Sequence, residues 1–346
     1  MDSITQMALG ATIQGALLGR WQGRKALLYG ALLGTLPDLD VVIDYPDAVD
    51  WMTHHRGFSH SLVVLSGLAL LLAWLVRRRH PTAGYSAQRL TLTLWLVLIT
   101  HPLLDAFTSY GTQLFWPLAT PPVAWSTLFI IDPLYTLPLL VAVGAGLARG
   151  LKDRPARLPT WALALSCLYI ACSVAGRQMA EQRVEQALAA AQIRPQALFV
   201  APAPFNVLLW RVIALDGEDY HEALVSWFDR APPRLSRIPR GTQLAAALRD
   251  SPQHQRLQWF TQGFLRYDRI DDQLIITDLR LGMTGFHPFR FAMASWQDGR
   301  WQLAERVERL PARRGDLAQL QQLFARIWNE EQPVPLEQWA QALQRP

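Results

Sequence analysis

The chain has 346 residues, enough for two domains, and a formal net charge of +5. Its basic residues are scattered or lie at the ends of apolar segments and form no stripe interleaved with aromatics, so nucleic acid is not an expected partner. The two cysteines, Cys167 and Cys172, lie in one apolar segment, which argues against a disulfide framework and a cysteine-based zinc site. The first residues lack a basic stretch and do not predict a cleaved signal peptide.

Six apolar segments in the first half of the chain predict membrane elements, because a spanning helix needs about 20 largely apolar residues and shorter runs form partial spans. The first two are short and rich in glycine and alanine, which predicts either short spans or a tightly packed hairpin that only partly crosses the bilayer. In chain order the segments are 4–19, 26–36, 61–76, 90–107, 128–148 and 158–175. Residues 1–176 are therefore expected to form an α-helical membrane domain of about six membrane elements.

Arginines and lysines gather in the short connections 20–25, 77–89 and 149–157. Such residues accumulate on the cytoplasmic side of a membrane, and alternating spans place all three groups on one side. The stretch 37–60, the loop 108–127 and both termini then lie on the other side. We expect a multi-pass protein of a bacterial inner membrane whose soluble C-terminal domain is periplasmic.

The pattern changes after the last apolar segment. Residues 177–192 predict a polar helical linker, and residues 193–346 predict a soluble α+β domain with an antiparallel sheet. Three strand pairs flank turn signals, namely 206–215 with 220–228, 263–270 with 273–281, and 289–295 with 301–304. Residues 317–328 and 336–343 predict helices.

Ionisable residues cluster beside the predicted spans, where each costs roughly 2.5–3.5 kcal/mol even on a lenient insertion scale. They form three motifs: Pro-Asp-Leu-Asp at 37–40, His-His-Arg-Gly-Phe-Ser-His at 54–60, and His-Pro-Leu-Leu-Asp at 101–105. The expected orientation brings all three to the same depth, opposite the arginines. Chain topology thus predicts a metal site, and the candidate ligands are Asp38, Asp40, His55, His60, His101 and Asp105.

The types of donor indicate the metal and the chemistry. His101 and Asp105 are four residues apart and share one face of a helix, so both can reach one ion. Imidazole and carboxylate together suit zinc, manganese or iron, and zinc is the usual choice for hydrolysis. Six donors are more than one ion needs, so the site could hold either one ion or two. Asp38 or Asp40 could accept a proton from water, and Arg56 could hold a phosphate or a developing oxyanion.

Several of these residues have a simpler interpretation. The motif at 37–40 could be a helix stop followed by a turn, and Arg56 could extend to lipid headgroups. Ser59 could cap a helix that starts at the next residue, and His54 could be a solvated neighbour of the site. Three residues are outer candidates for the site: Asp2, His54 and Asp132. The last of these could instead begin a helix.

Taken together, the motif at 1–6 (Met-Asp-Ser-Ile-Thr-Gln), the segment 34–40, the segment 55–61 and the His-Pro-Leu-Leu-Asp motif resemble the YdjM-like family of membrane-bound proteins regarded as metal-dependent hydrolases. The resemblance covers about the first half of the chain and implies that the same six residues form the metal site. Many members carry a histidine where this chain has Gln6. The His-x-x-x-Asp element is also similar to one in zinc phospholipases C and single-strand nucleases.

The expected function is therefore metal-dependent hydrolysis of a phosphoester or similar bond in a lipid-like substrate at the non-cytoplasmic face, with protein partners unknown. A non-catalytic membrane assembly or envelope protein with a structural metal is the alternative. A closed tetrahedral site would favour the structural role, and an open position the catalytic one. A metal transporter is disfavoured because the cytoplasmic ends of the spans show only arginines and lysines.

Overall fold

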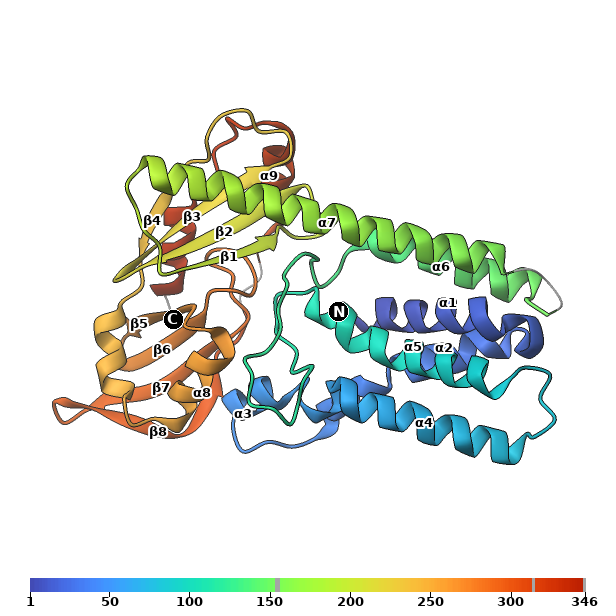
Figure 1. Ribbon diagram of the computed structural model, residues 1–346. Coiled ribbons are helices and arrows are strands. Elements are labelled where there is room, and N and C mark those ends of the chain that lie inside the picture. The colour runs from blue at the N-terminus through green and yellow to red at the C-terminus, as the bar shows by residue number, and fades with distance from the viewer. Residues whose placement is uncertain (153–155, 313–314, 345–346) are drawn as a thin grey trace. The chain divides into compact units, whose positions relative to one another are not determined.

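The computed structural model describes residues 1–152, 156–312 and 315–344, which form two compact units (Figure 1). Unit 1 comprises Met1–Ile43, His55–Trp125 and Ile130–Cys172, and its regular elements are helices. Unit 2 comprises Asp44–His54, Ser126–Phe129 and Ser173–Pro346, and it carries the strands β1 to β8. The chain thus has a helical N-terminal half followed by a domain with two antiparallel sheets, as the sequence predicts in outline.

Unit 1 begins with two helices, α1 (Ser3–Gln22) and α2 (Lys25–Gly34), in close contact. A Cβ atom added at Gly10 would lie 2.3 Å from the carbonyl oxygen of Gly30, and one added at Gly30 would lie 2.2 Å from the carbonyl oxygen of Gly10. Only glycine allows two helix backbones to approach so closely. A tightly packed helical hairpin is thus observed, while the way in which it crosses a bilayer stays a prediction.

The remaining helical elements of unit 1 follow in chain order. They are η1 (Leu36–Val42), η2 (Phe58–His60), α4 (Leu62–Arg79), α5 (Ala87–Ala106), α6 (Pro133–Arg149) and the first part of α7 (Arg157–Ala190). Leu18 of α1 packs with Leu65 and Ala69 of α4 and with Leu94 and Leu98 of α5. This contact holds α5 against its neighbours.

One helix of the described residues, α7, is long and apolar enough to cross a membrane by length and composition. The number rises to two if the bent pair Ala48–His60 and Leu62–Arg79 is one broken span, whereas α2 and α6 are shorter apolar helices. Six membrane elements therefore stay a prediction. The first two predicted elements differ from ordinary spans in two ways. Helix α2 has only 10 residues, and α1 buries polar side chains such as Gln6 and Gln14 among its apolar ones.

Unit 2 contains two four-stranded antiparallel sheets with strand orders β1-β2-β3-β4 and β5-β6-β7-β8. The strands of the first sheet are β1 (Ala197–Pro202), β2 (Leu209–Asp216), β3 (Asp219–Ser226) and β4 (Ser236–Pro239). Those of the second are β5 (Leu265–Ile270), β6 (Gln273–Asp278), β7 (Arg290–Gln297) and β8 (Arg300–Arg309). The three predicted hairpins are confirmed as β2–β3, β5–β6 and β7–β8.

Several elements of unit 2 were not predicted. β1 and β4 were missed, and β8 extends from Arg300 to Arg309, well beyond the predicted 301–304. Beyond Ala304 the strand reads Glu-Arg-Val-Glu-Arg, and the single apolar residue Val307 gives too little alternation to indicate a strand. The helical elements η3 (Thr242–Leu248) and α8 (Pro252–Thr261) connect the two sheets.

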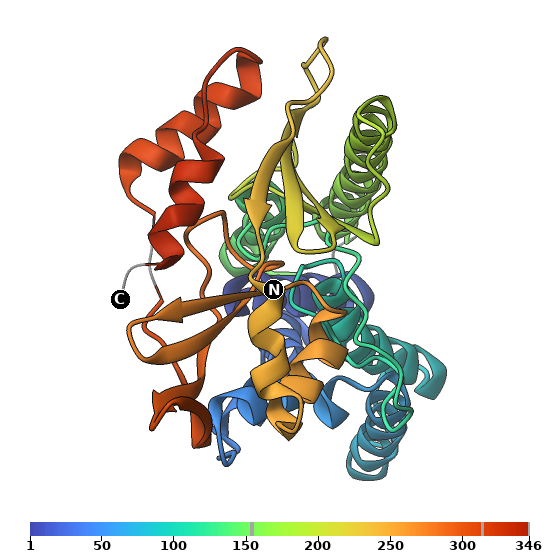
Figure 2. The same cartoon turned by 90° about the vertical axis from the view of Figure 1, so that its left-hand side faces the viewer.

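Helices cover both faces of the first sheet. Gly176 of α7 lies directly against the ring of Trp210 in β2, and a Cβ at this glycine would be 2.7 Å from that ring. On the opposite face, Leu323 and Ile327 of α9 (Leu317–Trp328) pack with Leu209 and with Trp339 of α10 (Leu336–Gln341), which the short η4 (Ala342–Gln344) follows. Figure 2 shows β1–β4 between the green α7 and the red C-terminal helices.

The short helix α3 (Ala48–His54) belongs to unit 2, although it lies in sequence between two motifs of unit 1. Arg256 of α8 holds α3 by donating from Nε to Thr53 Oγ1 at 3.0 Å and from Nη2 to the Thr53 carbonyl at 3.2 Å. Gln253 Nε2 donates to Asp47 Oδ2 at 3.2 Å. The segment 44–54 is therefore anchored on α8 by side-chain hydrogen bonds.

Candidate metal centre

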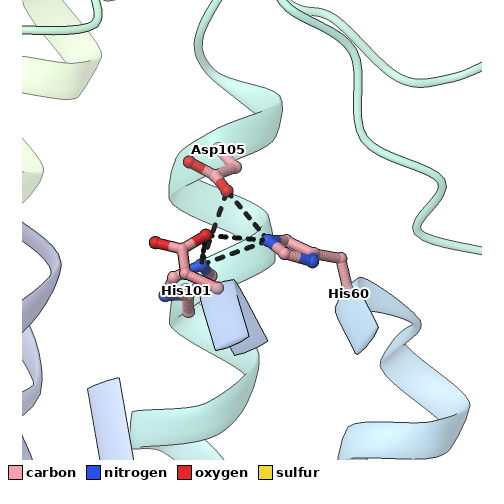
Figure 3. Close-up of side chains that lie close together, drawn as sticks. His60, His101 and Asp105 are labelled. Carbon is pink, nitrogen blue, oxygen red and sulfur yellow. Dashed lines mark hydrogen bonds and ion pairs between the residues drawn. The ribbon is translucent and has the colours of Figure 1, made fainter. Parts of the chain in front are cut away.

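Four side chains from three elements meet in unit 1 and form a candidate metal centre: Asp38, His60, His101 and Asp105. Asp38 comes from η1, His60 from the end of η2, and the other two from consecutive turns of α5. Figure 3 shows His101 and Asp105 projecting from one helix toward His60. Pro102 lies inside α5, and the helix continues through it to Ala106, so the four-residue spacing places both donors on one face.

The distances between the donor atoms suit one small cation. His60 Nε2 lies 3.2 Å from His101 Nε2, 3.3 Å from Asp105 Oδ2 and 3.5 Å from Asp38 Oδ1. His101 Nε2 lies 3.2 Å from Asp38 Oδ1 and 3.5 Å from Asp105 Oδ2. Ligands about 2.0–2.2 Å from a tetrahedral zinc ion are roughly 3.3–3.6 Å apart, so these spacings are close to those of a zinc site.

Hydrogen bonds on the far side of each ring set the orientation of both imidazoles. His101 Nδ1 donates to the carbonyl of Gly34 at 2.6 Å. His60 Nδ1 lies 2.9 Å from Ser59 Oγ, whose hydroxyl donates to Asp40 Oδ2 at 2.7 Å, so the ring nitrogen is the donor. A neutral imidazole with its proton on Nδ1 has an unprotonated Nε2, and metal-binding histidines show this arrangement.

The carboxylate of Asp105 gives the clearest indication that the site binds a cation. Its Oδ1 accepts from Gln6 Nε2 at 3.2 Å, pairs with Arg56 Nη2 at 3.2 Å and contacts the α-amino group of Met1. Its Oδ2 is buried, faces His60 and His101, and has no hydrogen-bond partner among the described residues. A buried carboxylate oxygen without a donor costs free energy unless a cation binds it.

Asp40 and His55 lie outside this group of four and pair with each other. His55 Nδ1 is 2.9 Å from Asp40 Oδ1, while Oδ2 accepts from the backbone N–H of Arg56 at 3.0 Å and from Ser59 Oγ. Burial raises the pKa of the Asp40 carboxyl, but the hydrogen bonds and charge of His55, with the Ser59 hydroxyl, outweigh burial and hold the pKa below its usual range. Asp40 is thus an ionised acceptor that holds the loop from 55 to 60.

Arg56 is buried and directed at the carboxylate of Asp105. Its Nη1 donates to Thr108 Oγ1 at 3.3 Å, and its guanidinium lies over the ring of Tyr110 with the carbon 4.8 Å from the ring centre. Its backbone has a φ of +62°, a left-handed conformation that the hydrogen bond to Asp40 supports. These contacts place a fixed positive charge next to the group of four.

The three outer candidates make contacts of other kinds. Asp2 caps α1 by accepting from the backbone and hydroxyl of Thr5. Asp132 caps α6 and accepts from the Tyr169 hydroxyl at 2.9 Å, which agrees with the simpler interpretation of a helix start. His54 is exposed in unit 2 and stacks on Tyr45 at 5.3 Å between ring centres.

Three contributors were not recognised from the sequence. Ser59 was interpreted as a helix cap, but α4 begins at Leu62 with Ser61 as its cap, and Ser59 instead links His60 to Asp40. The resemblance drew attention to position 6, where many members carry a histidine, but the contact of Gln6 with Asp105 was not predicted. The Gly34 carbonyl is a backbone group, and no side-chain pattern could indicate it.

The helical unit thus combines an apolar helix that is long enough to cross a bilayer with a largely buried group of two imidazoles and two carboxylates, a candidate metal centre. Residues 1–180 match the family described as YdjM inner membrane protein, and the chain belongs to this family. The family expected from the N-terminal motifs is thereby confirmed. The group of four lies entirely within the matched residues.

Two curated relatives are similar to the chain over part of its length. Over 159 residues it is 28% identical to the uncharacterized protein YfhP of Bacillus subtilis (strain 168), covering 43% of this chain and 47% of that protein. Over 93 residues it is 37% identical to the inner membrane protein YbcI of Escherichia coli (strain K12), covering 27% of this chain and 52% of that protein. The chain thus spans about half the length of these relatives. No solved structure matches it.

Proposed function

We propose that the chain is a membrane-embedded, metal-dependent hydrolase that cleaves a phosphoester or similar bond of a lipid-like substrate. The observation that carries this proposal is the convergence of two Nε2 atoms and the unpartnered Asp105 Oδ2 on one point. Zinc fits this donor set best, with manganese or iron as alternatives. The compact spacing of the donors favours one ion over two.

Burial divides the four donors into two classes with different roles. The side chains of His60, His101 and Asp105 are at most 1% exposed, whereas that of Asp38 is 21% exposed. The three buried groups form a set typical of catalytic zinc, which keeps three protein ligands and one open position. Asp38 borders solvent and is therefore the group placed to accept a proton from an attacking water.

A divalent metal held by His60, His101 and Asp105 would supply Lewis-acid chemistry, namely activation of water near neutral pH and polarisation of a phosphoryl oxygen. The protein's own groups prepare the rest of the site. Ser59 and the Gly34 carbonyl orient the two imidazoles, and Arg56 adds a fixed positive charge beside Asp105 that stabilises negative charge developing on a substrate. Asp40 holds the backbone of the loop that carries Arg56 and His60.

A structural metal site is the second candidate, and the same geometry supports it. If Asp38 is a permanent ligand, the four donors form a closed tetrahedral set, which is typical of structural zinc. The two proposals differ in the effect of Asp38→Asn. A catalytic site keeps its metal and loses at least about 10²-fold of its activity through loss of the base. A structural site loses metal affinity and thermal stability together.

The direct test combines metal analysis with a lipid-hydrolysis screen on the purified full chain. About one zinc per chain and release of a phosphorylated headgroup are expected, and His101→Ala should abolish both metal retention and hydrolysis. Full hydrolysis by a protein stripped of metal would refute the proposal.

We also propose that the site faces the periplasm of the bacterial inner membrane and that unit 2 is periplasmic. The support is the gathering of arginines and lysines in the three short connections 20–25, 77–89 and 149–157. An alkaline phosphatase fused after the C-terminal residue should be active in cells. An active cytoplasmic reporter at the same position would reverse the orientation.

A further inference from the structure

An apolar groove in unit 1 shares helix α5 with the candidate metal centre. It has a volume of about 470 Å³ and is lined by residues of α1, α5, α6 and α7, helices that can be followed in Figure 1. Leu9 and Ile13 line it from α1, Leu103 from α5, and Leu163 and Ile170 from α7. None of these residues belongs to the group of four.

Three aliphatic hydroxyl groups along the groove, those of Thr100, Thr160 and Ser166, are bonded inside their own helices. Thr100 Oγ1 donates to the Leu96 carbonyl at 2.6 Å, and Thr160 Oγ1 donates to the Ala156 carbonyl at 2.7 Å. Ser166 Oγ donates in the same way to the carbonyl of Ala162 at 2.9 Å. The groove therefore presents mainly hydrocarbon to an occupant, and a polar ligand would leave its own groups unpaired at a cost of about 1–3 kcal/mol each.

The length of the groove matches one leaflet of a bilayer. Its lining on α5 extends from Leu96 to Phe107, which corresponds to roughly 16 Å of helix at 1.5 Å per residue. This is about half of the ~30 Å hydrocarbon core of a membrane. One wall of the groove is α7, the helix that is long and apolar enough to span a bilayer, so acyl chains are the apolar molecules in its surroundings.

We propose that this groove binds one acyl chain of a membrane lipid. Thr100 and Leu104 line it and immediately precede His101 and Asp105, so a bound chain lies along the same two turns of α5 as two of the candidate ligands. A lipid held there is either a resident lipid or the substrate of the proposed hydrolase. The binding of the acyl chain itself does not depend on hydrolysis.

Two free, exposed cysteines of α7 provide a matched pair of probes. Cys167 lines the groove, and Cys172, five residues further along the same helix, does not. The experiment follows N-ethylmaleimide alkylation of each thiol by mass spectrometry, with the purified full chain in a steroid-based detergent and with dioleoylphosphatidylglycerol added. At a lipid concentration of about ten times Kd, alkylation of Cys167 should slow about tenfold while that of Cys172 changes less than twofold.

Equal slowing of both thiols would mean a general lipid shell, and no slowing of Cys167 would mean an empty groove. Either result overturns the proposal. A second variant covers the case of weak protection: Ala16→Phe fills the groove and should reduce co-purified phospholipid, whereas Ala164→Phe, at an exposed alanine of α7 outside the lining, should not. An equal amount of co-purified phospholipid in both variants would also contradict the proposal.

The same assay separates this proposal from the proposed function. His101→Ala removes a candidate metal ligand without touching the groove lining, so protection of Cys167 should persist in this variant even though hydrolysis is lost. Headgroup release with phosphatidylglycerol identifies the bound lipid as a substrate, and protection without release identifies a resident lipid. Loss of protection in His101→Ala would show that the groove requires the site, contrary to the proposal.

Discussion

The contact between α1 and α2 supports both the fold and the site, and Gly30→Ala tests this. A Cβ at Gly30 would lie 2.2 Å from the Gly10 carbonyl oxygen, whereas ordinary contacts begin at 3.4 Å, so the two backbones must separate by about 1.2 Å. Backbone atoms cannot rotate away as a side chain does. We expect a loss of about 1–3 kcal/mol of stability from overpacking, even though alanine favours a helix over glycine by about 1 kcal/mol.

The separation should also weaken metal binding, whichever helix moves. If α2 moves, the Gly34 carbonyl leaves His101 Nδ1, and a 2.6 Å hydrogen bond lengthened by about 1 Å is broken. If α1 moves, Gln6 leaves Asp105 instead. Loss of such a supporting hydrogen bond typically reduces metal affinity about 10- to 100-fold.

Two measurements check this prediction on the purified full chain: thermal unfolding in detergent and zinc affinity by competition with a chelator. Gly144→Ala is the matched control, since Gly144 lies in α6 and a Cβ there would have nothing within 4 Å. The control should be as stable as the unchanged protein or slightly more so. Unchanged stability and zinc affinity in Gly30→Ala would refute the role given to this contact.

Three further predictions concern other contacts. Ser59→Ala removes the hydrogen-bonded bridge between His60 and Asp40 and should lower zinc affinity about 10- to 100-fold, as measured by chelator competition. Ser59→Thr should restore the affinity. Equal affinity in the unchanged protein and both variants would contradict the role of the bridge. Arg256→Gln removes the hydrogen bonds to Thr53 that hold α3 and should speed backbone hydrogen exchange in residues 48–54. Arg249→Gln, at an exposed position, should leave this exchange unchanged. Slow exchange in both variants would show that other contacts hold α3. Burial and the charge of nearby arginines hold the pKa of His287 well below its ordinary value, so the unfolded chain takes up a proton below about pH 6.5 that the folded domain does not. The free energy of unfolding should therefore fall as pH decreases from 7 to 5.5, by up to about 1.4 kcal/mol per pH unit for this residue. In urea titrations, His287→Asn should reduce this dependence of stability on pH, whereas the control His80→Asn should not.

The sequence predicted the parts of the site that depend on spacing within one element. His101 and Asp105 share a face of α5 because residues four apart on a helix are neighbours, and their separation from the arginines follows from the length of the helix. The sequence also indicated that the motifs at 37–40 and 54–60 would lie near His101 and Asp105. Metal ligation itself stays a prediction for all six candidates.

What the sequence could not predict depends on local conformation. Asp38 and Asp40 are two apart in η1, and with three residues per turn of a 3₁₀ helix their side chains point about 120° away from each other. Only Asp38 therefore faces the two Nε2 atoms, and Asp40 turns to His55 and the loop backbone. The glycine contact of α1 with α2 and the role of the Gly34 carbonyl arise from tertiary packing, which no spacing rule reports.

The arrangement of acceptor atoms in the site supports a cation over a proton. The carboxylates of Asp38 and Asp105 each bring one oxygen within 3.2–3.5 Å of both Nε2 atoms, so four acceptor atoms converge in a largely buried place. One extra proton on His60 or His101 would add one N–H on Nε2 that could satisfy only one neighbour, and the other Nε2 and carboxylate oxygens would still face each other without a donor. A divalent ion contacts all of them at once. Zinc binding should therefore raise the thermal stability of the full chain, whereas acidification without metal should not reproduce that gain.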